Sequence, residues 1–586
     1  MTVSAACLSV LLCIFTFTVT SSGQQKRATA TPSRATYQKG VTALERGDLE
    51  TARSAFEEAV RLSPSSAEAH NSLGWVLLAQ GQIDASIVEF NSALKLKPAF
   101  AQAHINLANA FAKKRYLDAA QREVRKALRL APDSSEAHRT LGRILSFSGE
   151  VEQAAAELRK AIDLDATRWD VHDDLGSLLA QQSKFDDAAA QFQEALRLQP
   201  KAALALLHLG VVRWQQKAFD EAIELLQQAA AAAPQNPQPY YYLGQVFAEQ
   251  GKRPEAIAQF EHATELEPNL ADAHRQLGLQ LQRSGDTSRA IASFRRALQL
   301  QPDNPDAHNN LGLALVQSGD AGSAITEFEA ALRLRPTDTG YRGNLGVAYL
   351  QRADFDAAIR ELRLAIETTP DDATLHYNLG LALKLKDQLA DAVPELQKAA
   401  ALDPQQADIH YTLGVTLWQM GDFDKAADEL RAALKIKPDY AEAQYTLGTV
   451  FKQQNKLPEA SAALREAIRL QPDFAGAHTT LAAVLRQQGD SEGAAREAAA
   501  GQAISQERTA LQAATFNTNS GVRLLNAGDL DGAIAQFRSA IQLAPAYAPA
   551  HYQLSVALSR KGLKDEAKVE LDRAIALDPE TNRSSQ

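Results

Sequence analysis

Histidines recur at regular intervals along this 586-residue chain, and imidazole is a common zinc ligand in proteins. Successive members of the series are at least 34 residues apart, too far to share one ion that needs each ligand at about 2.0–2.1 Å. We therefore expect these rings to be structural and packed inside a repeated unit, and we expect no metal site. Ten of the twelve histidines belong to the series: His70, His104, His138, His172, His274, His308, His376, His410, His478 and His551.

Pairs of neighbouring carboxylates are the second candidate for chemistry, because two carboxyl groups can act as general acid and base. Adjacent residues on a helix point in different directions, so we expect these pairs on solvated faces and at helix starts. We also find no phosphate-binding glycine loop, no nucleophile elbow and no Cys or His metal spacing. The sequence therefore predicts neither an enzyme nor a cofactor. The pairs are Asp173–Asp174, Asp186–Asp187 and Asp371–Asp372.

The elements that carry these residues follow a 34-residue period. Glycine and alanine keep the same interval, as at Gly312 and Ala331. Self-similarity this strict indicates a solenoid of stacked units rather than several globular domains. Prolines mark the period at Pro64, Pro98, Pro132, Pro200, Pro234, Pro268, Pro302, Pro336, Pro370, Pro404, Pro438 and Pro472, and again at Pro545 and Pro579.

One period contains two helical patterns. In residues 67–100, the side chains of His70, Leu73 and Leu77 follow the i, i+3, i+7 spacing of one helix face. A second stripe of the same kind begins after Gly81, a residue suited to the left-handed conformation that ends a helix. Pro98 then stops the chain. Each period therefore predicts a pair of antiparallel helices, with small residues at Gly74 and Ala93 for close approach.

This pattern resembles the tetratricopeptide repeat (TPR) family. The resemblance rests on Leu311, Gly312, Ala324, Phe328, Ala331 and Pro336, and on the same types one period earlier. It implies an all-α fold, an α-solenoid of antiparallel helix pairs that forms a right-handed superhelix with a concave groove. We count sixteen repeats: repeats 1–14 in residues 33–508, and repeats 15–16 in residues 514–581, followed by a tail at 582–586.

Repeat 14 departs from the pattern in its second half, and residues 509–513 shift the phase by five. The alanine-rich stretch before them has high helix propensity. We expect a bend or a hinge of the array at this stretch, formed by one long continuous helix rather than by a flexible linker.

The resemblance places groove-facing residues at positions 2, 5, 6, 9, 12 and 13 of each repeat, counted from Ser33 in steps of 34. Amides at position 6 can donate and accept, and so can bind the backbone of an extended peptide. Tyr and Trp add contact area. We expect peptide-binding residues at Asn310, Asn344, Asn378, Tyr377, Tyr411, Tyr445 and Trp418.

The asparagine series is similar to that in the TPR region of O-linked N-acetylglucosamine transferase, without its catalytic domain. The carboxylate clamp of chaperone-binding members is missing, because Ile105 replaces the lysine expected beside Asn109. The alternative is that tyrosine and asparagine at these positions are a family habit and that partners bind elsewhere.

The N-terminal segment is apolar and uncharged from Ala5 to Val19, and small residues follow at Ser21 and Gly23. We expect a cleaved signal peptide at residues 1–23 and a disordered linker at 24–32. Both cysteines, Cys7 and Cys13, lie inside this segment, so the mature chain would have none. The expected location is periplasmic or secreted; an uncleaved membrane anchor is the alternative.

The sequence thus predicts a non-catalytic scaffold that binds a protein or an extended peptide in its groove. The net charge of −10 and the absence of a long basic stripe disfavour nucleic acid. A substrate-recruiting or assembly subunit of a glycosyltransferase, pilus or polysaccharide-export system is the alternative. Self-association through the terminal repeats is a further one, because no capping helix follows the last pair.

Overall fold

The computed structural model describes residues 32–578, and all regular secondary structure in that range is helical. The expected signal peptide, most of the linker and the last residues of repeat 16 and its tail lie outside the described residues. Pro32, assigned to the linker, is instead the first residue of the first helix. No helix in the described range has the length and apolarity needed to cross a bilayer.

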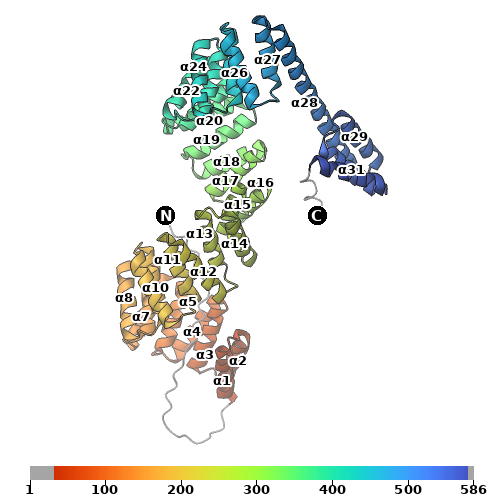
Figure 1. Ribbon diagram of the computed structural model, residues 1–586. Coiled ribbons are helices and arrows are strands. Elements are labelled where there is room, and N and C mark those ends of the chain that lie inside the picture. The colour runs from red at the N-terminus through yellow and green to blue at the C-terminus, as the bar shows by residue number, and fades with distance from the viewer. Residues whose placement is uncertain (1–31, 579–586) are drawn as a thin grey trace. The chain divides into compact units, whose positions relative to one another are not determined.

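The helices form two compact units, Met1–Pro302 and Asp303–Gln586. Within each unit, consecutive helices run antiparallel and pair into hairpins (Figure 1). The first unit contains α1 Pro32–Glu45, α2 Leu49–Leu62, α3 Ala67–Ala79, α4 Ile83–Leu96, α5 Ala101–Lys113, α6 Leu117–Leu130, α7 Ser135–Phe147, α8 Val151–Leu164, α9 Trp169–Gln181, α10 Phe185–Leu198, α11 Ala203–Gln215, α12 Phe219–Ala232, α13 Pro237–Glu249, α14 Arg253–Leu266, α15 Ala271–Ser284 and α16 Thr287–Leu300.

The second unit contains α17 Pro305–Gln317, α18 Ala321–Leu334, α19 Thr339–Gln351, α20 Phe355–Thr368, α21 Ala373–Leu385, α22 Leu389–Leu402, α23 Ala407–Gln419, α24 Phe423–Ile436, α25 Ala441–Gln453, α26 Leu457–Leu470, α27 Ala475–Gln487, α28 Ser491–Asn526, α29 Leu530–Leu543, α30 Ala548–Arg560 and α31 Lys564–Leu577. The all-α repeat solenoid predicted from the period is confirmed.

A glycine faces a phenylalanine ring at the centre of seven hairpins. A Cβ on Gly312 would stand 2.6 Å from Cε1 of Phe328, whose side chain is fully buried. Leucine replaces the ring in other repeats, as at Gly346 and Leu362. The small residue at position 8 therefore makes room for the large side chain at position 24, a more specific role than close approach of the helix backbones.

The turn inside each hairpin needs a residue with positive φ at position 15. Gly81 takes this conformation at φ 79°, as the sequence predicted. Aspartates at the next position cap the second helix in several repeats: the carboxylate of Asp320 accepts a hydrogen bond of 3.0 Å from the Ser323 amide. The turn thus ends one helix and starts the next within four residues.

Helix α28 replaces two helices and the turn between them. It runs unbroken for 36 residues through 509–513, which is the long helix expected from the alanine-rich stretch (Figure 1). Position 3 of a first helix normally packs against the preceding repeat: Ala103 is fully buried in one cluster with Ala93, whereas Phe516 at the same position is 67% exposed. The C-terminal half of α28 therefore begins a new, short stack rather than continuing the previous one.

We expect Gly312→Ala to destabilise its hairpin by about 1–3 kcal/mol, because the added methyl group collides with a fully buried ring. Gly322→Ala in the adjoining helix α18 is the matched control. Its Cβ would have only one neighbour within 4 Å, at 3.8 Å, so it should stabilise by about 0.5–1 kcal/mol. Amide hydrogen exchange in α17 and α18 measures both, because stability in a repeat array is local. Equal exchange in the two variants would contradict the account.

Candidate binding groove

The periodic histidines bridge their own hairpin to the preceding turn. Nδ1 of His376 lies 2.6 Å from the Glu395 carboxylate on the paired helix, and Nε2 lies 2.9 Å from the carbonyl oxygen of Pro370. The same two contacts recur at His70, His104, His138, His478 and His551. The structural role expected for the series is correct, but hydrogen bonds, rather than ring packing alone, supply it.

Other residues at position 4 of the repeat also have a structural role. Arg342 donates to Glu361 and to the carbonyl oxygen of Pro336 at 2.9 Å each, so a cation can replace the ring. In repeat 6 both partners are apolar: Leu206 is buried and Leu225 packs against the same core cluster. The partner at position 23 was not predicted from the sequence; it is a glutamate opposite eight of the ten histidines, but Gln191 opposite His172 and Ser293 opposite His274.

One pair of aspartates behaves differently from the expectation of solvated positions. Asp173 is 2% exposed, and its carboxylate lies 2.9 Å from Nδ1 of His208 in the next repeat. Asp174 accepts a hydrogen bond of 2.5 Å from Nε of Arg139 in the preceding repeat. Burial alone would lower the pKa of His208, but the Asp173 carboxylate outweighs it and raises that pKa. This pair therefore joins neighbouring repeats.

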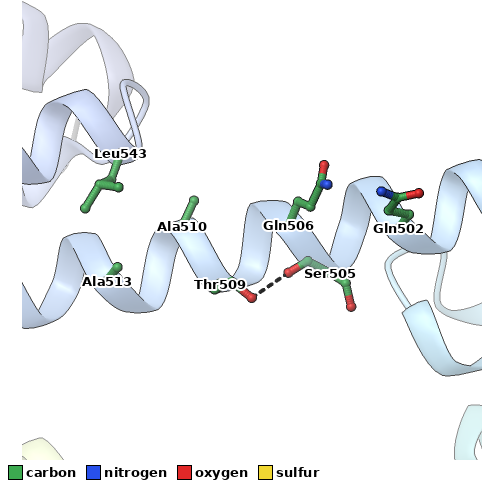
Figure 2. A pocket seen from close by; sticks show the side chains of 7 residues that line it. All are labelled: Gln502, Ser505, Gln506, Thr509, Ala510, Ala513 and Leu543. Carbon is green, nitrogen blue, oxygen red and sulfur yellow. Dashed lines mark hydrogen bonds between the residues drawn. The ribbon is translucent and has the colours of Figure 1, made fainter.

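No group of three or more His, Cys, Asp or Glu side chains within residues 32–578 is placed to hold a metal ion. A shallow, open hollow is formed by α28 and the end of α29, where Leu543 lies over Ala510 and Ala513 (Figure 2). It contains no titratable side chain, and the one hydrogen bond drawn there joins Thr509 to the carbonyl of Ser505. The side chains that line this hollow therefore include no group that could act as a general acid or base near neutral pH.

The seven predicted groove residues all lie on first helices of the second unit, from α17 to α25. All are half-buried, so each presents part of its side chain to solvent. The structure thus aligns them along one series of helices.

The three asparagines are not equivalent. Nδ2 of Asn344 donates to Oδ1 of Asn309 in the preceding repeat at 2.9 Å. Asn310 and Asn378 make no side-chain hydrogen bond within the described residues. Asn344 therefore joins neighbouring repeats, whereas the amides of Asn310 and Asn378 are half-buried and have no side-chain partner among the described residues.

The tyrosines make contacts of two kinds. The hydroxyl of Tyr377 lies 3.5 Å from that of Thr412 in the following repeat. The rings of Tyr411 and Tyr445 lie 4.9 Å and 4.7 Å from those of Tyr440 and Phe474, which end their own repeats. Burial raises the pKa of Tyr411, which keeps its hydroxyl a neutral donor. The indole ring of Trp418 makes no stacking contact and no hydrogen bond to the described residues.

Contacts from position 5 to position 6 of the next repeat were not predicted from the sequence. They occur in the first unit too, between Tyr37 and Ser72 at 3.0 Å and between Asn71 and Asn106 at 3.0 Å. These side chains therefore stabilise the stack of repeats, whether or not they also bind a ligand.

Family models agree with the geometry. A model described as Tetratricopeptide repeat matches residues 77–144, 213–278, 315–380, 385–450, 417–466 and 524–584. A second with the same description matches residues 37–104, 174–237 and 275–339. The fold is that of a helical-repeat scaffold for protein interaction. The chain belongs to the tetratricopeptide repeat family.

Solved structures with similar repeats include YrrB, described as a TPR protein with an unusual peptide-binding site, at 25% identity and a TM-score of 0.28, covering 31% of this chain and 94% of that one. The APC/C hetero-tetramer Cut9–Hcn1 has 16% identity and a TM-score of 0.38, covering 78% and 97%. Yeast Tom70 has 18% identity and a TM-score of 0.30, covering 72% and 96%. At these TM-scores we draw no conclusion about function from the three structures. A comparison with curated proteins found no match.

We expect His376→Leu to destabilise repeat 11 by about 1–3 kcal/mol, because Glu395 and the Pro370 carbonyl lose their partner. Adding Glu395→Leu should recover part of the loss, as the natural Leu206–Leu225 pair indicates. Hydrogen exchange of α21 and α22 in both single variants and the double variant gives the coupling energy, expected to be at least about 0.5 kcal/mol. Strict additivity would show that the two side chains do not act as a pair.

Proposed function

We propose that this protein is a non-catalytic interaction scaffold that binds an extended protein segment along the first helices of repeats 9–13. The observation that carries the proposal is the row of half-exposed amide and aromatic side chains on α17 to α25. Repeats occupy nearly all of the described range, which supports a role in recognition rather than catalysis.

The chemistry of the row suits a peptide backbone. Asn310 and Asn378 each offer an amide donor and an acceptor, and a peptide group offers the complementary pair. Tyr377, Tyr411 and Trp418 are held by their helices and supply contact area at low entropic cost. Binding of this kind reads the backbone more than the sequence.

We also propose that the protein is exported. The support is the uncharged apolar run from Ala5 to Val19, and the confinement of both cysteines to that segment. Recruitment of substrates to an envelope assembly machine remains the alternative role for such a scaffold.

A photo-crosslinking side chain at Asn378 should capture a protein segment in cells, because this position faces the proposed groove. The same side chain at Gln397, an exposed amide on the second helix α22, is the matched control. Mass spectrometry of the adducts identifies the segment. Adducts at Gln397 but not at Asn378 would place the partner on the second helices and overturn the proposal.

A further inference from the structure

A row of cations without counter-ions follows the C-terminal ends of the first helices in the second unit. Position 12 is Lys384 in repeat 11, Trp418 in repeat 12, Lys452 in repeat 13 and Arg486 in repeat 14. None of the three basic side chains forms an ion pair or a side-chain hydrogen bond with the described residues. We call Lys384, Lys452 and Arg486 the basic row.

Neighbouring cations in the same repeats do have partners. Nζ of Lys386 lies 2.5 Å from Asp356, and Nζ of Lys398 lies 3.0 Å from Asp371. Burial lowers the pKa of Lys384, and no described carboxylate offsets that cost. A half-buried ammonium in this state gains from an anion supplied by another molecule.

The surface around the basic row contains no acid at the three groove positions nearest to it. Positions 9, 12 and 13 of repeats 9–14 carry only apolar, amide, hydroxyl or basic side chains. Three acids of the adjoining turns are occupied: Asp354 caps α20 and pairs with Arg352, Asp422 caps α24 and pairs with Lys425, and Asp490 caps α28. A fourth, Asp387, follows Lys384 in the turn after α21 and forms no ion pair with it. The row therefore presents uncompensated positive charge.

Helix dipoles alone do not explain the row. Cations near a helix C-terminus are favoured by about 0.3–1 kcal/mol, and every first helix offers the same end. Yet position 12 of the eight repeats in the first unit contains no lysine or arginine. Those residues are Leu44, Leu78, Ala112, Ser146, Ala180, Trp214, Ala248 and Gln282.

We propose that the segment bound by this groove is acidic, with its carboxylates on Lys384, Lys452 and Arg486 and an apolar or aromatic side chain against Trp418. This inference rests on the proposed function and names its partner class. The basic row differs from the carboxylate clamp in position, because it uses position 12 of several repeats rather than positions 5 and 9 of one.

The spacing of the row sets the length of the segment. Packed helices lie about 8–10 Å apart, so three successive steps from Lys384 to Arg486 cover roughly 27 Å. An extended chain advances about 3.3 Å per residue, which corresponds to about eight or nine residues. Side chains about three and six residues after the first acidic one would meet Trp418 and Lys452 respectively, so the former position favours an apolar residue and the latter an acidic one.

Ten-residue fluorescent peptides test the proposal by anisotropy with the full chain. We expect a peptide of alternating Glu and Ser with a central Leu to bind at least tenfold tighter at low salt than its Gln or Lys versions, and to weaken as salt rises. Binding should change tryptophan emission in the wild type but not in Trp418→Phe.

The triple variant K384Q/K452Q/R486Q should lose at least tenfold in affinity for the acidic peptide. The control triple variant R363Q/K435Q/R465Q removes the same charge from exposed positions on second helices and should bind within twofold of the wild type. Circular dichroism checks that both variants fold.

Several outcomes overturn the inference. Equal binding of acidic, neutral and basic peptides, or equal losses in the two triple variants, removes the acidic preference but leaves the groove as a binding site. Capture at Asn378 of a segment without acidic residues also removes the acidic preference and leaves the groove as a binding site. Tighter binding of a ten-nucleotide single strand than of the acidic peptide assigns the row to nucleic acid. If no segment is captured at Asn378 at all, the proposed function fails together with the inference.

Discussion

The fold depends on the close contact between a glycine of the first helix, which has no Cβ, and a buried ring of the second helix. At Gly312 and Phe328 the two helices of a hairpin can meet only because position 8 has no side chain. The contact fixes which face of each first helix turns inward. The remaining face is left for solvent or a ligand, and repetition every 34 residues places the same face of successive helices in one row.

Hydrogen bonds then join each hairpin to the next. The bridge from His376 to Glu395 and to the Pro370 carbonyl ties the two helices to the turn before them. On the groove side, the pair Asn309–Asn344 connects consecutive first helices. Residues that line the groove therefore also set its spacing, so a change that removes a groove contact can also loosen the array.

The sequence predicted the helix pairs, the left-handed turn at Gly81 and the continuous helix α28, because these depend on local propensity and on a strict period. It did not predict the role of Asp173 or the commitment of Asn344, because both depend on how far a side chain reaches into the neighbouring repeat. The glutamates opposite eight of the ten periodic histidines were present in the sequence, but their role depends on the antiparallel register of the two helices. The candidate groove was located by position, whereas the availability of each side chain required the structure.

The central claim is that the exposed face of the first helices in repeats 9–14 binds an extended acidic segment. A crystal structure of the full chain with the acidic decapeptide tests it most directly. We expect the peptide across α21 to α27, with carboxylates within about 3 Å of Lys384 or Lys452. A peptide seated on the second helices, or on α28, would contradict the account.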